Sequence, residues 1–154
     1  MRRISVFFLV SLFTLGALPL FAQENFTPGN VVRVVHLRIK PGRTTEFWAD
    51  VRQNLKPIFE EYKKQGIIAN YSFHTKATTN SENDWSIGYV LDYPNYAALD
   101  GLADRTDPIT LKHYGSREAR TAAGNRRLEN ATVVEAYLIR RVDPKPMTAA
   151  AAPR

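Results

Sequence analysis

Aromatic residues recur at intervals of four positions in the part of the chain best suited to chemistry. Tyr89 and Tyr93 fall on one face of an alternating run that also holds Trp85, and Tyr71 has the matching place in an earlier run. These side chains could line a cavity for a planar or aromatic small molecule, with the phenol hydroxyls orienting it or acting as weak acids. The simpler interpretation is that they fill a core. The other predicted lining residues are Arg33 from a strand and Trp48 from a helix.

Three histidines form a second group of candidates. His74 is predicted to join Tyr89 and Tyr93 as a catalytic residue beside an aromatic substrate. A trio of His36, His74 and His113 would bind zinc or non-haem iron, and one of them could be an axial haem ligand. Their spacing fits no metal motif, so we predict no metal ligand and no cofactor. His36 could equally belong to a hydrogen-bonded network inside a barrel formed by two copies.

Other chemistries are excluded by what the chain lacks. It has no cysteine, so thiol nucleophiles, disulfides and cysteine-ligated metal centres are ruled out. It has no Ser-His-Asp order, nucleophile elbow or Gly-rich phosphate loop. Glu60 and Glu61 diverge on a helix and indicate solvated surface. The net charge of +6 comes from mixed charges along the chain, which favours a solvated basic surface over nucleic-acid binding.

The first 22 residues have the pattern of a secretory signal peptide. Two arginines precede an apolar run that ends at Phe21, and the small residue Ala22 closes it. Pro19 near the end of the run favours cleavage over a permanent anchor. We therefore predict a secreted or periplasmic protein with no stable membrane anchor once residues 1–22 have been removed.

The rest of the chain alternates between strand and helix periods. The predicted elements are a strand over 31–40, a helix over 44–66 kinked at Pro57, strands over 67–75 and 85–93, a helix from Pro94 that Asp107-Pro108 interrupts, a further helical start capped by Ser116, and a strand over 133–142. Residues 23–30 read as a turn-rich spacer and 143–154 as a disordered tail, because neither segment offers a core. The domain is thus predicted to span 31–142.

This order, βαββαβ, is the ferredoxin-like layout of the α+β class, a four-stranded antiparallel sheet with helices on one face. The second face would carry Val32, Val34 and Val90 without cover. Burying it against another copy is the natural solution, so we expect a homodimer.

At this point the chain resembles the dimeric α/β-barrel superfamily, whose members include antibiotic-biosynthesis-type monooxygenases, muconolactone isomerases and chlorite dismutases. The resemblance covers about residues 31–142 and is carried by Leu37-Arg38-Ile39-Lys40-Pro41-Gly42-Arg43 with Phe47, and by the segment from Val90 to Leu99. It implies a small-molecule cavity between the sheet and its helices. Tyr93 stands where the monooxygenase-like members usually carry Trp, and Leu102 where many carry His.

Three functions follow as hypotheses. The first is an exported small-molecule-binding protein of this barrel type. The second is a cofactor-independent monooxygenase or isomerase for a small aromatic or planar substrate. The third is a structural or interaction module with no pocket. A cavity above Tyr89 and Tyr93 with an arginine or histidine pointing in would favour the enzyme, and a filled one would favour the structural module.

Overall fold

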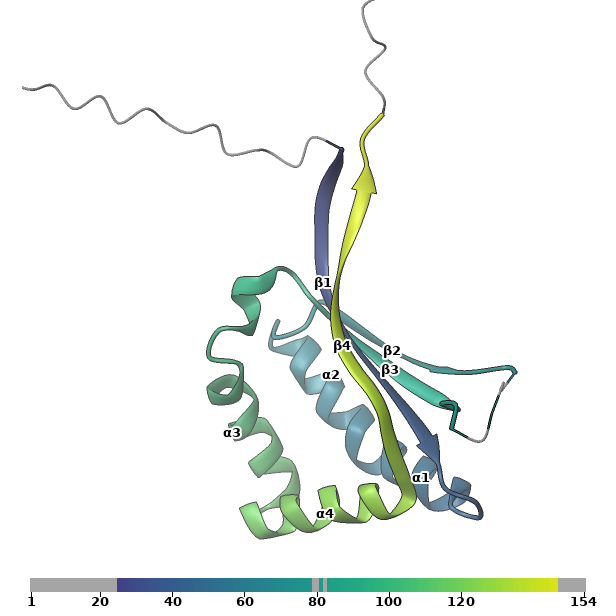
Figure 1. Ribbon diagram of the computed structural model, residues 1–154. Coiled ribbons are helices and arrows are strands. Elements are labelled where there is room, and N and C mark those ends of the chain that lie inside the picture. Colours follow the sequence, from purple (N-terminus) through teal and green to yellow (C-terminus); the bar gives the residue numbers. More distant parts are fainter. Residues whose placement is uncertain (1–24, 79–80, 82, 147–154) are drawn as a thin grey trace, which may run out of the picture.

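The computed structural model describes residues 25–78, 81 and 83–146. The predicted signal peptide and residues 147–154 of the predicted tail lie outside these residues. The described part forms one antiparallel sheet in the order β2-β3-β1-β4 with helices between its strands, which confirms the predicted α+β ferredoxin-like layout (Figure 1). Its elements are β1 (Phe26–Ile39), α1 (Thr44–Asp50), the π-helix η1 (Val51–Leu55), α2 (Lys56–Lys64), β2 (Asn70–Thr75), β3 (Ile87–Tyr93), the 3-10 helix η2 (Tyr96–Leu99), α3 (Leu102–Tyr114), α4 (Arg117–Asn130) and β4 (Ala131–Pro144).

The first helical segment bends where its proline requires it. Pro57 cannot donate the backbone hydrogen bond of a regular helix, and the turn before it widens into η1. A single π turn of this kind inserts one residue without ending the helix. The predicted kink therefore takes the form of α1, η1 and α2 in continuous succession, with Gly66 in the left-handed conformation (φ 69°) after α2.

Three predicted boundaries are wrong. The tail predicted from residue 143 starts too early, because β4 continues to Pro144. The spacer over 23–30 is not separate from the domain, because β1 starts at Phe26 and pairs with the end of β4 across an irregularity between Pro28 and Val31. Pro108 does not interrupt its helix either, because α3 runs through it to Gly115. Gly115 ends that helix with a φ of 81°, and the Ser116 side chain caps α4 as predicted by accepting a hydrogen bond from the Ala119 amide.

The core lies between the sheet and its helices. Strand alternation turns Val35 of β1 and Leu91 of β3 toward Phe47 of α1, and all three are almost fully buried. The same cluster continues through the aliphatic residues of η1 and α2. This apolar layer holds the sheet against the helices without any disulfide, as a domain of this size can do.

Within the described residues, no helix packs on the opposite face, which we call the open face (Figure 1). It carries Val32, Val34 and Val90, as predicted, because Val34 pairs with Val90 in the register of β1 and β3. Val32 and Val34 are not left uncovered, however, since they are only 2% and 6% exposed. Its edge strand β4 is the most exposed element of the sheet, and Tyr137 and Ile139 each keep at least 40% of their surface in solvent. Because β4 has a neighbour on one side only, it also offers unpaired backbone groups.

Candidate functional site

A pocket on the helix-covered face, which we call the helix-side pocket, lies between β1, β4 and the start of α3. Its volume is about 420 Å³, within the range of small-molecule sites. The pocket forms because α3 leaves the adjoining part of β4 uncovered, so that Leu138 remains 47% exposed. The residues that line it include Arg33, Tyr93, Leu99, Leu102, Ala136 and Leu138.

Arg33 brings a positive charge to this pocket. Strand alternation places it on the helix-covered side of β1, opposite Leu138 of β4. Within residues 25–146, so far as they are described, its guanidinium forms no hydrogen bond or ion pair. Arg127 on α4 differs, because its Nε lies 2.6 Å from Oδ2 of Asp50. Arg33 is therefore a cation that keeps its donors available for a ligand.

Tyr93 supplies a neutral phenol beside that charge. Burial raises the pKa of its hydroxyl, and the charges of Arg33 and Arg105 only partly oppose this. Burial also raises the pKa of Tyr89, and the charges of Arg33 and Arg127 oppose this with smaller effects. Both phenols stay protonated at neutral pH and act there as hydrogen-bond donors rather than as bases.

The remaining predicted lining residues are spread over the domain. Tyr71 packs against Phe59 and donates its hydroxyl hydrogen to Glu60, and burial together with Glu60 raises its pKa to about 12. Trp48 packs edge-on against Phe47 at the margin of the core. Neither residue lines the helix-side pocket.

Trp85 was predicted on the wrong face. Regular alternation begins only at Ile87, and the chain turns before it, where the Ser86 hydroxyl accepts a hydrogen bond from the Ile39 amide. The Trp85 ring consequently lies on the open face, stacked on the His36 ring with 4.1 Å between centroids and 4° between planes. It cannot line a cavity beside Tyr89.

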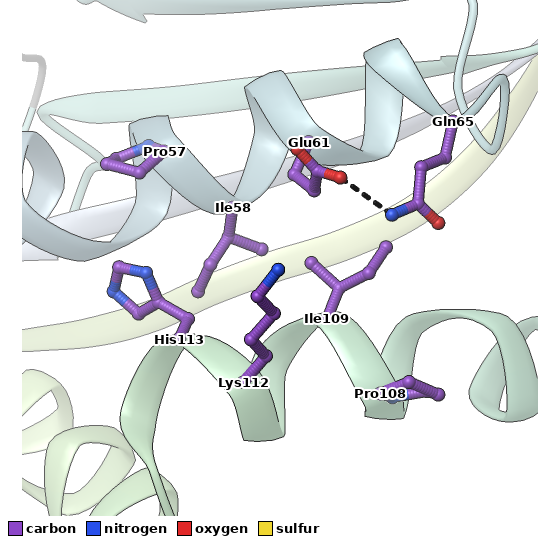
Figure 2. Close-up of a pocket in the computed structure, with 8 residues that line it drawn as sticks. All are labelled: Pro57, Ile58, Glu61, Gln65, Pro108, Ile109, Lys112 and His113. Carbon is purple, nitrogen blue, oxygen red and sulfur yellow. Dashed lines mark hydrogen bonds between the residues drawn. The ribbon is translucent and has the colours of Figure 1, made fainter.

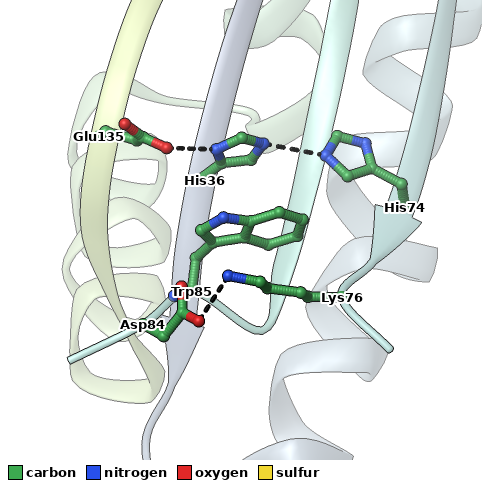
Figure 3. Close-up of polar contacts among 6 residues, drawn as sticks. All are labelled: His36, His74, Lys76, Asp84, Trp85 and Glu135. Carbon is green, nitrogen blue, oxygen red and sulfur yellow. Dashed lines mark hydrogen bonds and ion pairs between the residues drawn. The ribbon is translucent and has the colours of Figure 1, made fainter. Parts of the chain in front are cut away.

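The strongest polar arrangement of the described chain is a line of side chains on the open face, formed by Glu135, His36 and His74, which we call the histidine row (Figure 3). Nδ1 of His36 lies 2.7 Å from Oε1 of Glu135, and its Nε2 lies 3.1 Å from Nε2 of His74. The three residues come from β4, β1 and β2, so the row crosses the sheet. His36 is only 8% exposed.

Gly88 makes the row possible. It sits on β3, between His36 and His74 in the strand register. A Cβ atom at this position would lie 2.4 Å from Nε2 of His74 and 2.5 Å from Cδ2 of His36. Two rings on non-adjacent strands can therefore touch only because the intervening residue has no side chain.

The hydrogen bonds fix how protons are distributed when both rings are neutral. The Glu135 carboxylate accepts from Nδ1–H of His36, so Nε2 of His36 is an acceptor and receives Nε2–H of His74. Burial, followed by the charge of His36, lowers the pKa of His74. When both rings are neutral, each hydrogen bond of the row therefore has one donor and one acceptor.

The predicted catalytic group does not assemble as one site. His74 lies on the open face, whereas Tyr89 and Tyr93 belong to the helix-covered core. His113 is remote from both other histidines and bonds Oδ1 of Asn54 through Nε2, 2.9 Å away. Among the described residues no group of three His, Cys, Asp or Glu side chains has the arrangement of a metal site.

A second depression of about 410 Å³ lies between α2 and α3 (Figure 2). Ile58 and Ile109 form its floor, and Glu61 at its rim already accepts a hydrogen bond from Gln65. It is an open groove between two helices whose polar residues sit at the edge. We favour the helix-side pocket as the ligand site because a buried tyrosine and an unpaired arginine converge there.

No protein-family model and no curated protein matches this chain. Solved structures to which it is similar include HapK from Hahella chejuensis, with 12% identity and a TM-score of 0.47 over 80% of this chain and 99% of that one. Two others are dimeric ferredoxin-like proteins of unknown function. One, from Jannaschia sp. CCS1, has 12% identity and a TM-score of 0.44, covering 73% of this chain and 98% of that one. The other, from Bacteroides fragilis, has 15% identity and a TM-score of 0.41, covering 75% and 97%.

Proposed function

We propose that this protein binds a small, planar, anionic molecule in the helix-side pocket. The observation that carries the proposal is the unpaired guanidinium of Arg33 beside the protonated hydroxyl of Tyr93. A carboxylate would accept hydrogen bonds from both groups, and the leucines of the pocket would cover an aromatic ring. Arg105, whose charge also acts on Tyr93, adds to the positive potential.

Binding is favoured over catalysis by the protonation of the pocket. A monooxygenase or isomerase acting without a cofactor needs a base that removes a proton from its substrate. Tyr89 and Tyr93 have raised pKa values, and His74 lies across the sheet from them. A cofactor-independent monooxygenase or isomerase stays the alternative, in which these phenols would only orient the substrate.

We propose further that the protein is exported and acts as a homodimer paired through its open faces. The sequence pattern of residues 1–22 supports export. Pairing is supported by the apolar side chains of Tyr137 and Ile139, which stand in solvent beside the buried Val32 and Val34. In the described part of the chain no helix is both long and apolar enough to cross a membrane.

Calorimetric titration with naphthoate and with uncharged naphthamide tests the pocket. The two probes share a shape, so their difference reports the charge. We expect naphthoate to bind at least about tenfold more tightly, since a hydrogen bond to a charged group contributes about 1.5–3 kcal/mol. Arg33→Gln should abolish this preference. The matched control, Arg126→Gln on the exposed side of α4, should keep it. Equal binding of both probes by the unaltered protein would overturn the proposal.

Export has its own test. Expression with the native N-terminus in a secreting bacterial host should release a protein whose intact mass corresponds to cleavage after Ala22. A protein that keeps residues 1–22 and sediments with membranes would contradict this part of the proposal.

A further inference from the structure

The open face contains one buried acceptor that the isolated chain leaves without a hydrogen bond. Asp92 is 7% exposed, and its Oδ1 accepts no hydrogen bond from the residues described. Nη2 of Arg141 lies 3.2 Å from this oxygen, close enough for an ion pair but outside hydrogen-bonding geometry, and the Arg141 side chain is 60% exposed. A buried carboxylate oxygen in this state favours a donor arriving from outside.

The other polar groups of the face need no such donor. Glu135 and the two histidines bond to one another, and Lys76 bonds Asp84 while lying over the Trp85 ring. A surface whose ionisable groups are satisfied internally can be covered without leaving buried charges unpaired. Each end of the face also carries an acid and a base, Glu135 with His36 and Asp92 with Arg141. Such a surface is complementary to a second copy of itself.

The row can keep its geometry only in some protonation states. Nε2 of His36 and Nε2 of His74 are 3.1 Å apart, so one of the two must present a lone pair to the other. When both rings are imidazolium, both nitrogens carry hydrogens that point at each other, and the contact changes from attraction to repulsion. The rings must then rotate apart, and Gly88 leaves no side chain between them to resist this.

The charges around the row add to this effect. Facing or flanking it are the carboxylates of Glu135 and Asp84 and the cations of Arg38 and Lys76, while Asp92 and Arg141 lie at the other end of the face. Gly88 of β3 contributes no charge, and β2 contributes His74 itself. Since two carboxylates are matched by two cations around the row, protons added to it leave a net positive charge. In a homodimer the same positive charge would appear on both sides of the interface.

We propose that the histidine row makes pairing of the open faces depend on pH, so that protonation of both rings releases the two copies. This inference rests on the homodimer proposed above. In the paired state at least one of the two facing Nε2 atoms keeps its lone pair, and acid that protonates both drives the rings apart into the interface. Each copy must then release a proton when it pairs. The dimer Kd therefore rises by up to about tenfold per copy for each pH unit below the pKa at which that proton binds.

Sedimentation velocity of the purified protein across a concentration series, at about pH 7.5 and about pH 5.5, tests the inference. We expect the dimer Kd to rise at least tenfold at the lower pH. His74→Gln should still pair but lose this pH dependence, because the glutamine amide can donate to His36 and does not titrate. His113→Gln, a matched change of a histidine on α3 that contacts Asn54, should keep the pH dependence of the unaltered protein.

The outcomes separate the two proposals. A dimer whose Kd is the same at both pH values, or tighter in acid, would overturn the proton dependence and leave the pairing intact. A monomer at every concentration and pH would overturn both. If His74→Gln fails to fold, NMR titration of the His74 ring in the unaltered protein gives the answer instead. A ring that titrates at the same pH in monomer and dimer would contradict the inference.

Discussion

The two faces of the sheet are built by different physical means. The helix-covered face is stabilised by burial of large apolar side chains around Phe47. The open face holds a few small aliphatic residues and a chain of hydrogen bonds through His36. Apolar packing tolerates a pocket at its margin, whereas a hydrogen-bonded line fails when one position shifts. The first face is therefore suited to holding a variable ligand, and the second to switching between two states.

The largest effect should come from the apolar face. Phe47 is 1% exposed at the centre of the core, and Phe47→Ala should lower the free energy of unfolding by about 4 kcal/mol through lost burial and an unfilled cavity. Urea titration measures this. Leu128→Ala is the matched control, since Leu128 is 57% exposed and its truncation should change stability by less than about 0.5 kcal/mol. Similar losses for the two variants would refute our account of this face.

The open face should show its dependence on one missing side chain. Gly88→Ala forces the rings of His36 and His74 apart and should cost about 3 kcal/mol through overpacking and the broken hydrogen bond. A Cβ added at Gly124 in α4 meets no atom within 4 Å. Gly124→Ala should instead stabilise by about 0.5–1 kcal/mol because alanine favours a helix. If both variants match the unaltered protein in urea, the rings are not held as described.

The two faces should also respond to opposite ends of the pH scale, with smaller effects. On the open face the pKa of His74 is lowered from 6.5, so the folded state binds fewer protons than the unfolded state just below that pH. Stability is then complete above about pH 6.5 and falls as the pH drops. Thermal unfolding of dilute protein should follow this course, and His74→Gln should flatten it. An unchanged midpoint down to pH 5 would contradict the assignment.

On the helix-covered side the alkaline limit should be set by tyrosine. Burial, opposed in part by a hydrogen bond to Thr106, raises the pKa of Tyr62 to about 12. Its stabilising contribution is complete below pH 10 and is lost as the pH rises toward 12, because the unfolded phenol ionises first. Phenolate absorbance during alkaline titration should show a late component to which Tyr71 also contributes, and Tyr62→Phe should reduce this component without removing it. A single component near pH 10 would exclude this burial effect.

Local patterns in the sequence were sufficient to predict the helix-covered face and insufficient to predict the open face. Alternation placed Tyr89 and Tyr93 under the helices, and the Ser116 cap followed from residue type alone. Trp85 was misplaced because its segment leaves strand geometry just before Ile87. Pro108 was predicted to break its helix because a proline cannot donate the regular backbone hydrogen bond. Helix α3 nevertheless continues through it, which depends on the whole helix and not on this residue alone.

The histidine row could not be predicted from local sequence. His36 is 38 residues from His74 and 99 from Glu135, and only the register of strands β2, β3, β1 and β4 brings them together. One signal was available, namely a glycine in the middle of a strand, which often marks a close approach of neighbouring groups. Glu135 gave no signal of its own, since it lies in a strand that is exposed along most of its length.

The pairing of β1 with β4 has a consequence for how the protein is made. These strands lie at opposite ends of the domain sequence (Figure 1). Their pairing extends to the Lys145 amide, which donates a hydrogen bond to the Asn25 carbonyl oxygen at 2.9 Å. A ribosome-bound chain lacks β4 until synthesis of the domain is nearly finished, so its central strand β1 has one neighbour missing throughout. Such late closure slows folding. For the export proposed above this delay would be an advantage, because a chain that passes through a translocation channel must still be unfolded.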